Sequence, residues 1–282
     1  MRRCTAFALV LVVGLAAAAA TAKAGTSGWW ERRQAAVRYV EGRQGVVSFA
    51  FVTPQGKLRG YRKWRPAPSA SVLKAMLLVA YLNRASVRRR ALTDSDRSLL
   101  APMIRWSDNA TATRVLGIVG QRKLDRLADR ANMRHFRLRS PWGLSEITAG
   151  DQARFFYRID RYVPRRHRRY ASWLLAHVVR SQRWGIPPEV PSGWRIFFKG
   201  GWGTGTGRVT HQSALLRDGR RRIAIAVLTE WNSSHGHGAR TIRGIAARLL
   251  RTPLPLPAEQ RAQRKRSRLS HPGGLRLPLR MA

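Results

Sequence analysis

Alternating apolar and polar residues, the pattern of β-strands, occur in two stretches that lie far apart in this 282-residue chain. Residues 46–52 and 58–64 alternate on either side of a Pro54-Gln55-Gly56 turn and predict a hairpin. Residues 195–199, 209–216 and 223–229 repeat the pattern near the other end, with an Asp218-Gly219 turn between the last two. Because helical periodicity fills the interval, these stretches predict one antiparallel sheet with a helical lobe inserted, an α/β (α+β) fold.

Helical periodicity predicts eight helices, over residues 29–41, 69–84, 93–104, 110–119, 123–131, 149–159, 170–182 and 239–250. The helix that starts at Ser69 or Ser71 is apolar nearly all round, which is typical of a helix buried in the middle of a domain. Lys74 lies in it, and a lone buried cation costs several kcal/mol unless it is paired or neutral. We therefore expect Lys74 to be functional.

The N-terminal 24 residues have the pattern of a signal peptide. Two arginines precede an apolar run over residues 6–20, and Ala22-Lys23-Ala24 forms a small-residue cleavage site before Gly25. We expect export to the cell envelope or medium, with cleavage near Ala24; an uncleaved N-terminal anchor is the alternative. Cys4, the single cysteine, lies inside this segment, so no disulfide is expected in the mature protein.

The rest of the chain is expected to form one folded domain and a tail. Residues 25–251 form the domain, with a sheet lobe over 29–66 and 190–251 and a helical lobe over 67–189. Residues 252–282 are rich in Pro, Leu and Arg without a period and predict a disordered basic tail.

A formal net charge of +40 favours polyanionic partners: nucleic acid, anionic lipid surfaces or the acidic polymers of a cell wall. Export favours the wall polymers, whereas an arginine-rich genome would give the same surface without a partner. Nucleic acid is not expected, because nothing in the chain resembles a nucleic-acid-binding module. No transmembrane partner and no cofactor are predicted.

Three short motifs carry the candidate chemistry: Ser71-Val72-Leu73-Lys74, Ser107-Asp108-Asn109 and Lys199-Gly200-Gly201-Trp202. A serine with a lysine three residues later on a helix places a hydroxyl beside an amine, a nucleophile beside a base. Only seven of the 54 cationic side chains are lysines, and two of those seven lie in these motifs. Arginine stays protonated, so lysine marks the positions where a proton can be transferred.

Each motif also has a purely structural interpretation. Ser71 is compatible with a helix N-cap, and Ser107 or Asn109 with a cap of the next helix. Lys199 and its glycines are compatible with a strand end and a turn. The ordered set of three favours the chemical interpretation.

These motifs resemble the S-x-x-K, S-D-N and K-T-G signature of the class A β-lactamase and penicillin-recognising serine enzyme superfamily, and the resemblance extends from about residue 30 to 250. It implies a two-lobe fold with a five-stranded antiparallel sheet flanked by terminal helices, an all-helical lobe, and a serine acylated by a β-lactam or a D-Ala-D-Ala stem peptide of peptidoglycan. The resemblance implies four catalytic residues: Ser71 as nucleophile, Lys74 as base or proton relay, Ser107 as proton shuttle, and Lys199 as holder of the substrate carboxylate. It implies that the N–H groups of Ser71 and Trp202 form the oxyanion hole. The substrate contacts that it implies are Asn109, Gly200, Gly201, Trp202 and Thr204. Lys199 would also lower the pKa of Lys74 by like-charge repulsion.

Two departures from the family pattern matter. Gly200 stands where the family has threonine or serine, so a hydroxyl for the substrate carboxylate is missing, and Thr204 or Thr206 is the available substitute. The family's deacylating glutamate is followed shortly by an asparagine, whereas Glu146 here leads through Ile147 and Thr148 straight into a predicted helix. We therefore expect acylation with poor deacylation.

Histidines add little to this chemistry. His235-Gly236-His237 lacks carboxylate or cysteine companions and predicts an exposed turn rather than a metal site. His211 lies in a predicted strand facing the site and is expected to be structural or to line the substrate.

The alternatives to an enzyme are a catalytically silent version of this fold that binds anionic wall polymer, and a secreted binder of nucleic acid or another polyanion.

Overall fold

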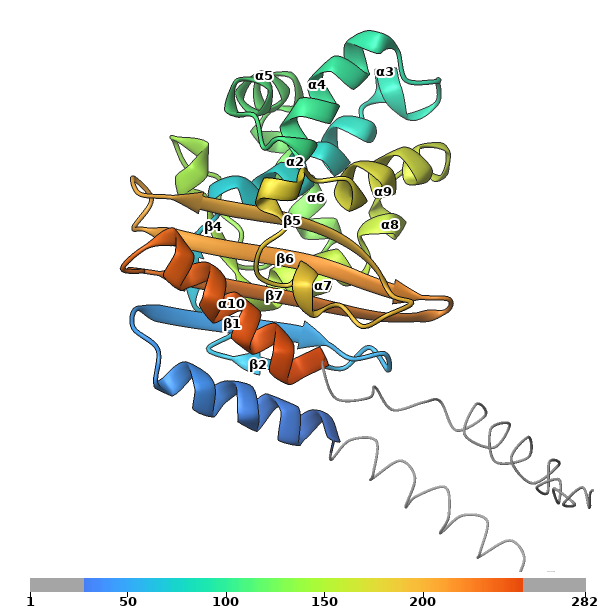
Figure 1. The fold of residues 1–282 in the computed structure, drawn as a ribbon. Helices are drawn as coiled ribbons and strands as arrows, with labels where there is room; N and C mark the ends of the chain where they lie inside the picture. The colour runs from blue at the N-terminus through green and yellow to red at the C-terminus, as the bar shows by residue number, and fades with distance from the viewer. Residues whose placement is uncertain (1–27, 251–282) are drawn as a thin grey trace, which may run out of the picture. The chain divides into compact units, whose positions relative to one another are not determined.

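A five-stranded antiparallel sheet, in the order β2-β1-β7-β6-β5, forms the centre of the computed structural model (Figure 1). The structure describes residues 28–250. The strands are β1 (Val46–Val52), β2 (Leu58–Tyr61), β5 (Arg195–Gly203), β6 (Val209–Asp218) and β7 (Arg221–Glu230). The N-terminal hairpin joins the C-terminal one through β1 and β7, with Phe49 opposite Val227. The prediction of one sheet from two distant segments is confirmed.

Helices cover both faces of the sheet because its central strands are apolar on both sides. Ala224, Ala226 and Leu228 of β7 join the core that the sheet shares with the helical lobe. Side chains alternate along a strand, so Ile225 and Val227 point to the opposite face. α10 (His235–Leu250) packs against β6 and β7 and crosses in front of the sheet in Figure 1.

The first helix, residues 28–41, is fastened to α10 by its side chains. The guanidinium of Arg32 donates to the Leu249 carbonyl at 2.6 Å, and the Tyr39 hydroxyl donates to the Arg240 carbonyl at 3.3 Å. Gly244 allows this approach, because a Cβ there would collide with the Tyr39 ring. Two helices distant in sequence thus lie together on one side of the sheet.

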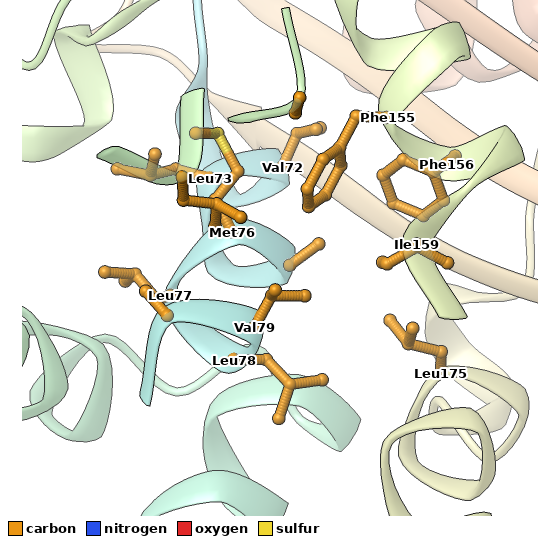
Figure 2. Close-up of a cluster of buried hydrophobic side chains, with 14 of the residues drawn as sticks. Val72, Leu73, Met76, Leu77, Leu78, Val79, Phe155, Phe156, Ile159 and Leu175 are labelled. Carbon is orange, nitrogen blue, oxygen red and sulfur yellow. The ribbon is translucent and has the colours of Figure 1, made fainter. Parts of the chain in front are cut away.

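α2 (Leu73–Leu82) is the central helix of the helical lobe, and all ten of its residues are buried. Its side chains pack toward Phe155 and Phe156 of α7 (Figure 2). The remaining helices are α3 (Ala85–Arg88), α4 (Asp94–Arg105), α5 (Asn109–Val119), α6 (Gln121–Arg130), α7 (Ala149–Tyr157), α8 (Ile159–Tyr162) and α9 (Arg168–Ala176). The 3-10 turns are η1 (Ala70–Val72), η2 (Trp142–Leu144), η3 (Arg165–His167), η4 (Arg180–Gln182) and η5 (Pro187–Glu189).

Several predicted element boundaries were wrong, and the largest error is at the helix predicted to end at residue 182, which is α9 and ends at Ala176. β2 ends at Tyr61 rather than residue 64, because Arg62 takes a left-handed φ of 45° that no strand continues. β5 runs four residues past its predicted end, to Gly203, because it pairs with β6 along its whole length. α10 starts at His235, four residues early, so His235-Gly236-His237 is a helical turn and not a loop.

A second, two-stranded sheet was missed. β3 (Pro66–Pro68), predicted only to break the chain, pairs with β4 (Glu146–Thr148). Proline is tolerated there because a two-stranded ladder leaves one side of each strand without a partner. This ladder lies directly before the first motif and holds it next to the segment that follows α6.

Residues 32–250 lie in one compact unit. The predicted signal peptide (1–24) and basic tail (252–282) fall outside the described residues. Within residues 28–250, no helix is long and apolar enough to cross a membrane.

Candidate active site

Ser71 lies in the 3-10 turn that leads into α2, and it is not a cap. Ser69 precedes the turn, and the residue between them, Ala70, has a left-handed φ of 42°. Ser71 is partly exposed, and its hydroxyl has no hydrogen-bond partner among residues 28–250. An exposed hydroxyl held at a strained turn before a buried helix is available to react.

Strand β5 passes immediately beside this turn at Gly201. A Cβ built on Gly201 would lie 2.7 Å from the backbone nitrogen of Ser71 and 2.9 Å from that of Val72. Only glycine allows this approach. The third motif is thereby brought against the backbone N–H groups of the first, although the two are more than a hundred residues apart in sequence.

The second motif forms the turn between α4 and α5. Ser107 has a left-handed φ of 60°, and Asp108, not Ser107 or Asn109, caps α5 by accepting a hydrogen bond from the Thr111 N–H at 2.7 Å. The Asp108 carboxylate also accepts from the Thr111 hydroxyl at 2.8 Å. Capping by Asp108 leaves the side chains of Ser107 and Asn109 free to turn toward α2.

Ser107 joins the two lysines of the motifs. Its hydroxyl lies 3.2 Å from Lys74 Nζ and 2.9 Å from Lys199 Nζ. Lys74 also donates to the Ser107 carbonyl and, at 2.7 Å, to Oδ1 of Asn109. Lys199 donates to the Gly200 carbonyl at 2.8 Å. Three segments distant in sequence therefore meet in one chain of hydrogen bonds.

Burial sets the protonation of both lysines. Desolvation lowers the pKa of Lys74 to about 7, partly opposed by the negative charge of Asp108. The fully buried Lys199 also has its pKa lowered, first by desolvation and then by repulsion from Lys74. The sequence assigned the shift of Lys74 to Lys199, whereas its main cause is burial. At neutral pH a substantial share of Lys74 is unprotonated and able to accept a proton.

The pH dependence of acylation is expected to reveal this shift. If neutral Lys74 is the base, the acylation rate rises with pH through a midpoint near 7 and then levels off. Asp108→Asn keeps a capping oxygen but removes the charge that raises the pKa of Lys74, so the midpoint should move to lower pH. Stopped-flow acylation by a β-lactam between pH 5 and 10 measures both profiles. A midpoint near the ordinary lysine value would contradict the base assignment.

Neither Glu146 nor Asp108 offers a carboxylate free of hydrogen-bond partners. Glu146 lies in β4, where its carboxylate accepts hydrogen bonds from Arg139 at 3.1 and 2.8 Å. Asp108 is engaged by Thr111. Instead, the indole of Trp142 in η2 faces Lys74, whose Nζ lies 5.1 Å from the ring centre. An aromatic face stabilises a nearby ammonium but cannot activate water.

Trp184 explains why the third motif has glycine where a hydroxyl residue was expected. A Cβ on Gly200 would lie 3.2 Å from the Trp184 ring. That ring packs edge-on against Trp202 and His235, at centroid distances of 5.9 and 4.7 Å. Gln212 fixes the loop by donating to the Trp184 carbonyl at 2.6 Å. A threonine at position 200 would have to displace this indole.

Neither threonine of the β5–β6 turn replaces that hydroxyl in the structure. Thr204 is exposed in the turn beyond the end of β5. The Thr206 hydroxyl donates to the Gly203 carbonyl at 3.4 Å, in the same turn. Both lie on the chain past Trp202, away from Lys199 along the strand.

His211 is structural. Its Nδ1 accepts from the Thr229 N–H at 3.0 Å, so its Nε2 carries the proton and donates to the Pro68 carbonyl at 2.8 Å. Burial lowers its pKa to about 4, and the ring is neutral at physiological pH. His211 therefore fastens β6 to the segment just before Ser71.

Histidines at the start of α10 serve packing roles. His235 contacts Trp184 and Trp202, and the Thr210 hydroxyl lies 3.2 Å from its Nδ1. His237 lies against Arg43, with ring nitrogens 3.3 and 3.4 Å from the guanidinium. In the part of the chain that the structure describes, no three His, Cys, Asp or Glu side chains are grouped to hold a metal ion.

The sequence profile of the beta-lactamase enzyme family matches residues 90–252, more than half of the chain. The chain belongs to this family. The match starts after the first motif, so Ser71 and Lys74 are placed by the structure and not by the profile. No curated protein sequence matches the chain at a significant level.

Solved structures with the same fold include a β-lactamase from Sphaerobacter thermophilus, which is 21% identical with a TM-score of 0.69 over 81% of this chain and 99% of that chain. A β-lactamase from Xanthomonas campestris is 16% identical, with a TM-score of 0.68 over 78% and 96% of the two chains. PBP-A is 15% identical, with a TM-score of 0.65 over 78% and 94%. These likenesses show the β-lactamase fold that the motifs implied, and the family is one of serine hydrolases.

Sequence reasoning missed Trp142, Trp184 and the anchoring role of Gln212. None of the three belongs to a motif, so no motif spacing includes it. The one available signal was Gly200, because a glycine where the family has threonine or serine leaves room for a bulky neighbour.

Proposed function

We propose that this protein is an acyl-serine enzyme in which Ser71 is acylated by β-lactams or by D-Ala-D-Ala peptides. The observation that carries the proposal is the hydrogen-bonded chain from Lys74 through Ser107 to Lys199, assembled one turn from an unpartnered serine hydroxyl. Burying two ammonium groups together is costly, and a fold gains nothing from it unless their protons are used. The catalytically silent alternative is not favoured for that reason.

Acylation would proceed by proton transfer along this chain. Neutral Lys74 takes the Ser71 proton as Oγ attacks the carbonyl carbon, and the developing oxyanion accepts from the N–H groups of Ser71 and Trp202. The C–N bond then breaks, and the Ser107 hydroxyl gives its proton to the leaving nitrogen while taking the one held by Lys74. The product is an ester on Ser71 with Lys74 neutral again. Lys199 holds the Ser107 oxygen in place throughout.

The proposed substrates follow from the family and from the expected location. A β-lactam and a D-Ala-D-Ala peptide share a reactive carbonyl beside a nitrogen leaving group, which the arrangement above accommodates. The signal-peptide pattern of residues 1–24 supports export, which would place the enzyme beside peptidoglycan. We propose a secreted or envelope location on that ground.

The decisive experiment is covalent labelling. A fluorescent penicillin is expected to label the purified protein, and peptide mapping by mass spectrometry should find the adduct on the peptide that contains Ser71. Unlabelled penicillin should compete, which separates specific acylation from adventitious reaction. An adduct on another residue, or no adduct, would contradict the proposal.

The acyl-enzyme is expected to persist. Hydrolysis of the ester needs a base to activate water, and of the two candidate carboxylates Asp108 is held by Thr111 and Glu146 by Arg139. Nitrocefin turnover should therefore stay well below that of an ordinary enzyme, about 10 per second, and intact-mass spectra should retain the adduct.

Glu146→Gln provides the control for this expectation. It should leave the lifetime of the adduct unchanged, since Glu146 pairs with Arg139. The expectation would be wrong if the unmodified protein turned over nitrocefin at a typical enzymatic rate and Glu146→Gln abolished that turnover. Glu146 would then be the deacylating base.

A further inference from the structure

A concave site lies at the end of α2 opposite Ser71. Its cavity measures about 430 Å³ and is lined by Ala80, Asn83, Ala85, Arg88, Lys123, Arg126, Leu127 and Arg130. A neighbouring cavity of about 550 Å³ shares Lys123 and Arg126 with it and adds Arg122. Both volumes lie in the range of ordinary ligand sites. We call the two together the α6 groove.

The cations of the α6 groove are not neutralised by the protein. No carboxylate lines either cavity. Asp125 and Asp129 belong to the same helix but line neither cavity, and neither forms an ion pair among residues 28–250. The same holds for Arg88, Lys123 and Arg126. Like charges gathered in a hollow concentrate a positive potential that attracts anions.

Arg130 is held in place before any ligand arrives. Its guanidinium donates to the Tyr162 carbonyl at 2.9 Å and to Oδ1 of Asn83 at 3.5 Å, and it lies over the Tyr162 ring at 5.6 Å. Asn83 donates in turn to the Tyr162 carbonyl at 2.8 Å. A cation held in this way loses little conformational entropy when an anion binds.

We propose that the α6 groove binds a linear phosphate polymer that carries no bases. Arginine forks and a lysine match phosphate oxygens spaced along a chain, and two adjoining cavities suit a ligand longer than one phosphate. Single-stranded nucleic acid is normally held by base stacking as well as by charge. No aromatic side chain lines either cavity, so the groove offers charged contacts to phosphates without an aromatic surface on which bases stack.

The α6 groove is separate from the acylation site. Ser71 precedes α2 and Ala80 lies near its other end, about 14 Å away at the rise of a helix. A polymer bound there would keep the enzyme close to an anionic matrix without occupying the acylation site. The proposal does not depend on the acylation chemistry.

Fluorescence anisotropy with labelled long-chain polyphosphate tests the proposal on the full-length protein. Lys123→Gln/Arg126→Gln removes the two cations that both cavities share. Arg59→Gln/Arg220→Gln removes two exposed cations elsewhere and makes the same change in net charge. All four side chains are exposed, so folding should be preserved, and circular dichroism provides the check that it is.

The Lys123→Gln/Arg126→Gln variant should bind polyphosphate about tenfold more weakly at about 0.1 M salt. The slope of its log affinity against log salt concentration should fall by the equivalent of about two ionic contacts. The affinity of the matched variant should change less than about twofold. Equal weakening in both variants would overturn the proposal in favour of a diffuse field. Tighter binding of single-stranded DNA than of polyphosphate at equal phosphate number, lost in the groove variant, would overturn the ligand class.

Discussion

Lys74→Arg is expected to lower the rate of acylation by about 1,000-fold while the protein stays folded. The variant keeps the positive charge and much of the side-chain length, but a guanidinium does not give up its proton near neutral pH. A base of this kind contributes about 100- to 10,000-fold to catalysis. The second-order rate of penicillin acylation measures the loss, and circular dichroism confirms the fold.

Lys57→Arg is the matched control, because Lys57 is exposed in the turn between β1 and β2 and should tolerate the same exchange without effect. Lys199→Arg would be mild if Lys199 only held the substrate carboxylate, the role that the family resemblance implies, since a guanidinium can also hold a carboxylate. Its full burial between the Ser107 hydroxyl and the Gly200 carbonyl changes that expectation to a large loss. A Lys74→Arg rate within about tenfold of the unmodified protein would mean that another group takes the Ser71 proton.

Gly201→Ala is expected to lower acylation by about 100-fold or more. The added Cβ would come within 3 Å of the backbone nitrogens of Ser71 and Val72, which are main-chain atoms and cannot rotate away. β5 would have to move from the Ser71 turn, and a displacement near 1 Å at a reacting centre costs about that factor. Crowding should also lower the free energy of unfolding by about 1–3 kcal/mol.

Gly205→Ala separates the local effect from the general cost of replacing a glycine. Gly205 lies in the turn after β5, and nothing lies within 4 Å of a Cβ built there. Its acylation rate and denaturation midpoint should stay close to those of the unmodified protein. If Gly201→Ala loses stability but acylates normally, the approach of β5 serves packing and not the oxyanion.

Periodicity was enough to predict most of the elements because it reflects burial along one segment at a time. The helix after Ser71 was predicted as buried from its composition alone, and all ten residues of α2 are buried. The five-stranded sheet followed from the family resemblance, and its assembly from two distant segments followed from the strand patterns. Where predictions failed, as at β3 and β4, the partner lay some eighty residues away and no local pattern indicated it.

The sequence by itself determined the fold class, the central buried helix, and the three motifs that carry the candidate chemistry. Only the tertiary structure decided how those side chains act on one another. The contact of Ser107 with both lysines and the indole of Trp142 over Lys74 each join segments far apart in the chain, and the Trp184 ring beside Gly200 joins a loop to the strand that follows it. Burial of charge depends on what packs around it in three dimensions, so the lowered pKa of Lys74 and the full burial of Lys199 are properties of the fold and not of either motif.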